Sequence, residues 1–223
     1  MTNSYPKDIA LLGVPIEVGA SQKGALMGPA ALRTAGIVPL LESLDFTVAD
    51  HGDILRRELT FTDEAPPSNA KHYREIKAWT GETATRAYAM AASGAIPVFL
   101  GGDHSLSMGS VSGVARHWHE QGRELFVLWL DAHADYNTPE TTITGNMHGM
   151  SGAFLCGEPG LDDLLPRPLR SPIAPRQLGL FGLRSVDKKE KELLAQRDVW
   201  IADMRRIDEF GVSVLMREFI ERV

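Results

Sequence analysis

Acidic and imidazole side chains follow an apolar segment in the middle of the chain. The apolar residues 125–130 lead directly into the sequence DAHAD. Side chains two residues apart point the same way in extended backbone, so Asp131, His133 and Asp135 are expected to converge beyond a buried strand. The alanines between them leave room for a bound group. This combination of carboxylates and imidazole predicts a metal site.

A further candidate ligand follows another apolar segment, residues 96–100. There the chain reads GGDHS, and the glycine pair permits a sharp turn before His104. Ligands bind at the carboxyl ends of strands in doubly wound folds, so His104 is expected to face the first group. Asp103 is expected to support the turn rather than to bind a ligand. Two imidazoles and two carboxylates without sulfur suit a divalent ion such as Mn²⁺ and argue against a zinc–thiolate site.

Alternating strands and helices must position these side chains. The predicted strands cover residues 9–14, 46–49, 96–100, 125–130, 178–183 and 199–202. The predicted helices cover residues 28–44, 70–93, 107–121, 150–155, 187–196 and 211–223. This alternation predicts a parallel sheet with helices on both faces. The sequence has no repeat or linker, which favours a single α/β domain over residues 1–223.

Composition limits the partners and the cellular compartment. The formal net charge of −6 and the pI of about 5.6 argue against nucleic acid or an anionic membrane as a partner. A single cysteine, Cys156, excludes an intrachain disulfide framework and predicts a cytoplasmic location. No apolar run approaches the roughly 18 residues of a membrane span. These features favour a small-molecule substrate.

The motifs together resemble those of the ureohydrolases, and specifically the arginases. GGDHSL, DAHADYNT and TGNMHGM carry the likeness, and LGVPIEVGASQKGALMGPAALR and GLRSVDKKE extend it over most of the chain. The resemblance implies a three-layer α/β/α fold with a mostly parallel central sheet. It implies hydrolysis of L-arginine to ornithine and urea with two Mn²⁺ ions, in a homo-oligomer, a trimer or hexamer. The implied metal ligands are His104, Asp131, His133 and Asp135.

The resemblance also assigns substrate contacts. Asn137, Thr144 and Asn146 match positions that hold the α-carboxylate of arginine, although a hydrogen-bonded surface loop is the better interpretation of these residues taken alone. Asp187 matches a residue near the α-ammonium group, and Glu190 a nearby acidic support. For both acids, capping of a helix and compensation of its dipole remain the alternative.

Two residues are expected to move protons. The resemblance implies that Asp135 takes the proton of the attacking hydroxide and passes it to the leaving nitrogen. His148 lies on the same loop, and an imidazole titrates near neutral pH, so it is expected to shuttle protons to solvent. The alternative for His148 is a packed loop histidine.

Relative to the family, the chain is expected to be incomplete at its C-terminus. The resemblance implies a later strand near the middle of the sheet with a DxD-type metal motif, and a later acidic substrate contact, and neither occurs in these 223 residues. The chain alone is therefore expected to bind fewer than two manganese ions, to release little urea and to associate through uncovered strand edges. The alternatives are agmatinase or another guanidino or formimino ureohydrolase, and an inactive metal-binding homologue.

Overall fold

The computed structural model describes residues 7–63, 65–166, 169–170 and 172–223. These residues form two three-stranded sheets in which every strand pair is parallel, with the strand orders β2-β1-β3 and β4-β5-β6. The strands are β1 (Asp8–Val14), β2 (Thr47–Asp53), β3 (Ile96–Gly101), β4 (Val127–Leu130), β5 (Leu178–Leu183) and β6 (Trp200–Asp203). Parallel pairing with intervening helices confirms the predicted α/β class.

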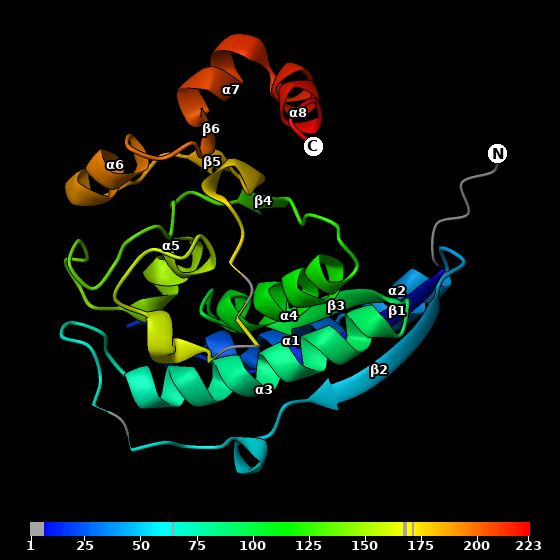
Figure 1. Ribbon diagram of the computed structural model, residues 1–223. Coiled ribbons are helices and arrows are strands. Elements are labelled where there is room, and N and C mark those ends of the chain that lie inside the picture. Colours follow the sequence, from blue (N-terminus) through cyan, green and yellow to red (C-terminus); the bar gives the residue numbers. More distant parts are fainter. Residues whose placement is uncertain (1–6, 64, 167–168, 171) are drawn as a thin grey trace.

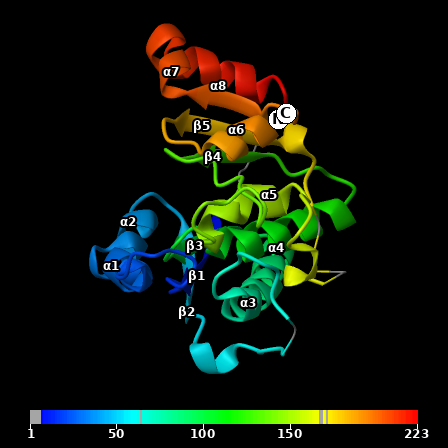
Figure 2. The same cartoon turned by 90° about the vertical axis from the view of Figure 1, so that its left-hand side faces the viewer.

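The two sheets are separate in space. No strand ladder joins β3 to β4 within the described parts of the chain, so each of these strands ends its own sheet. In both views the short helix α5 (Ser151–Leu155) lies between the sheets (Figures 1 and 2). The strands predicted for a central sheet thus form two smaller sheets, and the loops after β3 and β4 face the region between them.

Helices cover both faces of the first sheet, because β1 is apolar on both sides. Ile9 and Leu11 pack with the side chains of α2 (Ile37–Glu42), while Leu12 faces the main core. Figure 2 shows α1 (Gly28–Thr34) and α2 on one side of this sheet and α3 (Tyr73–Ala92) and α4 (Leu106–Glu120) on the other.

Helices α3 and α4 approach closely along a stripe of small residues. A Cβ added at Gly109 would lie 2.6 Å from the Thr83 Cβ, and one added at Gly113 would lie 2.3 Å from the Ala84 carbonyl oxygen. Glycine is therefore required on α4 at both positions. This packing fixes the start of α4, directly after the segment that carries His104.

One predicted helix is divided, and one further helix was not predicted. Residues 28–44 form α1 and α2 because Gly36 takes φ 90°, which interrupts the helix. The predicted helix 211–223 is α8 (Val212–Ile220), and α7 (Met204–Phe210) precedes it unpredicted, with Gly211 at φ 79° between them. The helix predicted at 187–196 is α6 (Lys188–Leu194). No helix in the described ranges is long and apolar enough to cross a bilayer.

Candidate metal and substrate site

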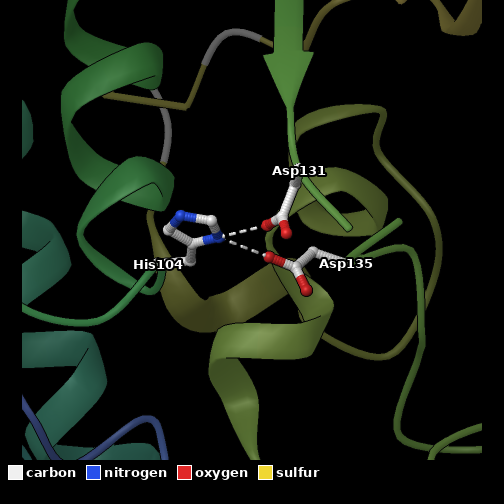
Figure 3. Close-up of side chains that lie close together, drawn as sticks. All are labelled: His104, Asp131 and Asp135. Carbon is white, nitrogen blue, oxygen red and sulfur yellow. Dashed lines mark hydrogen bonds and ion pairs between the residues drawn. The ribbon is translucent and has the colours of Figure 1, made fainter. Parts of the chain in front are cut away.

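Three predicted metal ligands converge between the two sheets. The His104 Nδ1 atom lies 2.8 Å from Asp135 Oδ2 and 2.9 Å from Asp131 Oδ2. His104 follows β3 of the first sheet, and both aspartates follow β4 of the second (Figure 3). One potential ligand atom from each residue lies within 4.8 Å of the others. The sequence prediction that these two strand ends meet is confirmed.

A tight turn after β3 presents His104. A Cβ at Gly102 would lie 1.7 Å from the Ile16 carbonyl oxygen, so only glycine fits at this position. Asp103 is buried, and its Oδ2 accepts hydrogen bonds from the backbone N–H groups of Gly19 (2.8 Å) and Ala20 (3.1 Å). Asp103 therefore ties the turn to the loop after β1, which agrees with the supporting role expected for it.

The segment after β4 is bent, whereas the sequence predicted an extended backbone there. Strand structure ends at Leu130, and the His133 N–H donates to Asp131 Oδ1 (3.1 Å) in a local bend. Asp135 has φ 48°, a left-handed conformation that is uncommon outside glycine. The predicted alternation of side chains in extended backbone is therefore wrong. A bend and a left-handed residue bring Asp131 and Asp135 together.

His133 lies beside this group rather than within it. Its side chain is 61% exposed, and its Nδ1 atom lies 3.5 Å from Asp131 Oδ1. Among the described residues, the group of mutually close potential ligand atoms contains His104, Asp131 and Asp135 only. The metal-ligand role of His133 stays a prediction.

The electrostatics of the site favour a cation between the carboxylates. Asp135 is buried and Asp131 half-buried, and both face the same imidazole nitrogen. The hydrogen bond with Asp135 raises the pKa of His104 above its usual value, against the opposing effect of burial. One imidazole nitrogen and several carboxylate oxygens without sulfur form a donor set that fits Mn²⁺.

Two of the predicted substrate contacts lie against each other. The Asn137 side chain is buried, and its amide donates to Asp187 Oδ2 (3.2 Å). Its Oδ1 accepts from Thr141 Oγ1 (2.9 Å). Asp187 is the residue before α6, so the start of this helix supports the loop beyond the metal ligands.

Glu190 is held by backbone rather than exposed to a ligand. It is 4% exposed, and its two oxygens accept from the N–H groups of Tyr136 (2.7 Å) and Asp187 (3.1 Å). Burial raises the pKa of the Glu190 carboxyl, and these hydrogen bonds oppose that shift. The bond from the Asp187 N–H is the helix-capping arrangement named as the alternative for Glu190, and its role as an acidic support near the substrate stays a prediction.

Thr144 and Asn146 form a second pair along the loop. Thr144 Oγ1 accepts from the Asn146 N–H (3.2 Å), and the Asn146 side-chain amide donates to Ser21 Oγ (2.7 Å). A cavity of about 470 Å³ adjoins Asn146 and is lined by Glu17, Val18, Ala20, Ser21, Gln22, Lys23, Lys71 and His72. The loop after β1 carries no predicted site residue, yet it lines most of this cavity.

His148 has a defined tautomer. Its Nδ1 atom lies 2.8 Å from the Gly19 carbonyl oxygen, which can only accept a hydrogen bond. Nδ1 therefore carries a proton, and in the neutral imidazole the lone pair is on Nε2. This is the arrangement of an imidazole able to accept a proton.

Comparisons with known proteins agree with the motifs. Residues 7–223 match the family model described as the arginase family. An arginase of Agrobacterium fabrum is 44% identical over 220 residues, which cover 97% of this chain and 66% of that protein. An arginase of Brucella melitensis is 41% identical over 216 residues, which cover 96% of this chain and 69% of that protein.

Solved structures show the same likeness. The native arginase of Bacillus caldovelox at pH 5.6 superposes with a TM-score of 0.85 at 34% identity, over 98% of this chain and 71% of that one. The arginase of Bacillus cereus gives 0.83 at 31% identity, over 96% and 70%. The chain thus spans about two thirds of the length of these relatives. It belongs to the arginase family.

Proposed function

We propose that this chain carries an arginase-type active site that hydrolyses the guanidinium group of L-arginine to ornithine and urea. The convergence of His104, Asp131 and Asp135 from two separate strand ends supports this proposal most directly. These residues, with His133, would hold two Mn²⁺ ions together with further ligands. When bound, the ions would activate water as a nucleophile at near-neutral pH.

The chain's own residues orient the substrate and move its protons. Asn137, Thr144 and Asn146 would hold the α-carboxylate, and Asp187 would face the α-ammonium group. The water oxygen bonds to the guanidinium carbon, and the bond from that carbon to the side-chain nitrogen of arginine breaks. Asp135 would carry the proton from the water to the leaving nitrogen.

His148 would exchange protons between the site and solvent. The lone pair on Nε2 is the acceptor for this step, because Nδ1–H is engaged by the Gly19 carbonyl. We propose a cytoplasmic homo-oligomer, a trimer or hexamer, as the working form, with L-arginine as the partner and no role for nucleic acid or membrane.

Manganese binding tests the metal assignment. Asp131→Asn and His133→Ala should each lower the manganese content of the purified chain, measured by elemental analysis, while circular dichroism shows an intact fold. Asp208→Asn, an exposed acid on α7, is the control and should bind as much manganese as the parent. Equal occupancy in Asp131→Asn and the parent would show that the carboxylate is no ligand.

Substrate preference tests the proposed chemistry. Urea release from arginine should exceed release from agmatine by orders of magnitude, because agmatine lacks the carboxylate that Asn137, Thr144 and Asn146 would bind. Comparable kcat/KM values for the two substrates would contradict the arginase assignment and favour a broader guanidino hydrolase.

A further inference from the structure

The left-handed backbone at Asp135 needs support from its surroundings. A non-glycine residue at φ 48° is strained by about 1 kcal/mol or more. The Asp135 carbonyl accepts from the Gly152 N–H at 2.7 Å, which holds one edge of the peptide group between Asp135 and Tyr136. The N–H of Tyr136 forms the opposite edge of the same peptide group.

Tyr136 is fixed at both ends. Its N–H donates to Glu190 Oε1 (2.7 Å), and its ring is fully buried. Its hydroxyl donates to Glu158 Oε1 at 3.1 Å. A side chain held at its tip and at its backbone has little freedom to rotate.

Glu158 is itself held by a cation. It is 6% exposed, and its two oxygens accept from Arg197 Nε (2.5 Å) and Nη2 (2.9 Å). A bidentate guanidinium–carboxylate pair of this kind fixes the orientation of the carboxylate and compensates its charge. Arg197 lies in the turn between α6 and β6, and Glu158 follows α5. Glu158 therefore accepts from both Arg197 and Tyr136, and joins the turn before β6 to the residue after Asp135.

We propose that Arg197, Glu158 and Tyr136 form a brace that positions Asp135 for metal binding. The brace acts through the backbone: it holds Tyr136 in place and so keeps Asp135 in its left-handed conformation, with its carboxylate facing His104. These are positioning residues, and the proposal rests on the proposed function in taking Asp135 as a metal ligand.

The chain contains a chemically similar group that serves as a control, with a more exposed glutamate. Arg206 Nη2 contacts both oxygens of Glu218 (2.8 and 3.0 Å), and Glu218 Oε1 also accepts from the Trp200 indole N–H (2.8 Å). This is again an arginine–glutamate–aromatic group, but it joins α7 and α8 to β6. Glu218→Gln should therefore alter α8 without affecting Asp135.

Two measurements on the full chain test the brace. In metal-free protein, Tyr136→Phe and Glu158→Gln should speed amide hydrogen exchange across residues 131–137 about tenfold, and Glu218→Gln should not. In titrations with Mn²⁺ alone, followed by electron paramagnetic resonance, both variants should bind roughly 10- to 100-fold more weakly than the parent. Tyr136→Phe keeps the buried ring, so it remains informative if Glu158→Gln does not fold.

Specific outcomes overturn the brace. Exchange across residues 131–137 that is unchanged in Tyr136→Phe would show that the hydroxyl holds nothing in place. If Glu218→Gln weakened Mn²⁺ binding as much as Glu158→Gln does, the cause would be a general loss of stability rather than the brace. A parent chain that binds no Mn²⁺ would contradict the proposed function, while the exchange experiment on metal-free protein would still decide the brace.

Discussion

At the scale of single residues, Glu190 shows how one carboxylate can serve two segments. The sequence left helix capping and substrate support open for it. In the structure each of its oxygens accepts from a different backbone N–H, that of Tyr136 or that of Asp187. The first of these donors lies beside the metal ligands and the second at the start of α6. Glu190 thus ties a helix to the site loop.

Glu190→Gln should destabilise the fold. The substitution leaves one acceptor oxygen and turns an amide group toward the other backbone N–H, which loses its partner inside the protein. We expect the free energy of unfolding, measured by denaturant titration, to fall by about 1–3 kcal/mol. Glu192→Gln, an exposed change on the same helix, should leave that energy within about 0.5 kcal/mol of the parent. Similar stability of both variants would contradict this role.

Cys156 should be a slow nucleophile. Burial raises the pKa of its thiol to about 12, so the reactive thiolate is scarce at pH 8.5. Alkylation by iodoacetamide under native conditions should be roughly a thousandfold slower than for free cysteine. The alkylation rate should keep rising with pH until the chain unfolds, because the thiol ionises only near pH 12. A rate that levels off near pH 9 would contradict the raised pKa.

At the scale of elements, apolar runs and helix formers predicted the six strands and the long helices α3 and α4. The break inside residues 28–44 was missed because it depends on the φ value of Gly36, which composition does not reveal. Helix α7, before Gly211, was not predicted. The sequence placed Asp131 and Asp135 correctly beside His104. The predicted cause, alternation of side chains in an extended backbone, was wrong. The left-handed conformation of Asp135 depends on tertiary contacts that no local pattern encodes.

Two glycine substitutions should have opposite effects on the paired helices. A Cβ at Gly113 would lie 2.3 Å from the Ala84 carbonyl oxygen, whereas a Cβ at Gly81 on α3 would meet nothing within 4 Å. Gly113→Ala should lower the free energy of unfolding by about 1–3 kcal/mol. Gly81→Ala should raise it by about 0.5–1 kcal/mol through helix propensity. Thermal denaturation should show a lower melting temperature for Gly113→Ala and a higher one for Gly81→Ala. Equal changes in melting temperature would show that the fold does not require glycine at the contact between the helices.

At the scale of the whole molecule, the candidate metal site joins the two sheets. His104 belongs to a loop of the first sheet, and Asp131 belongs to a loop of the second. The rule that ligands bind at carboxyl ends of strands predicted their meeting. It could not predict that the strands would divide into two sheets, because strand order depends on long-range pairing rather than on local sequence.

Metal should therefore stabilise the fold. An ion bound by residues from both sheets binds the folded chain and not the unfolded one. At a free Mn²⁺ concentration a hundredfold above Kd, the stabilisation should be about 2.7 kcal/mol. Melting temperature should rise with added Mn²⁺ and fall with a chelator, and Asp131→Asn should abolish the difference. An unchanged melting temperature in the parent would indicate that no ion joins the sheets.

Each sheet is built from one continuous part of the chain. The first uses strands between residues 8 and 101, and the second uses strands between residues 127 and 203. During synthesis, the first sheet and helix α3 are available before β4 leaves the ribosome, and domains generally fold from the N-terminal side. Pulse-labelled amides of β1 and β3 should become protected before those of β5. The first sheet would then offer a formed surface on which the later segments can order.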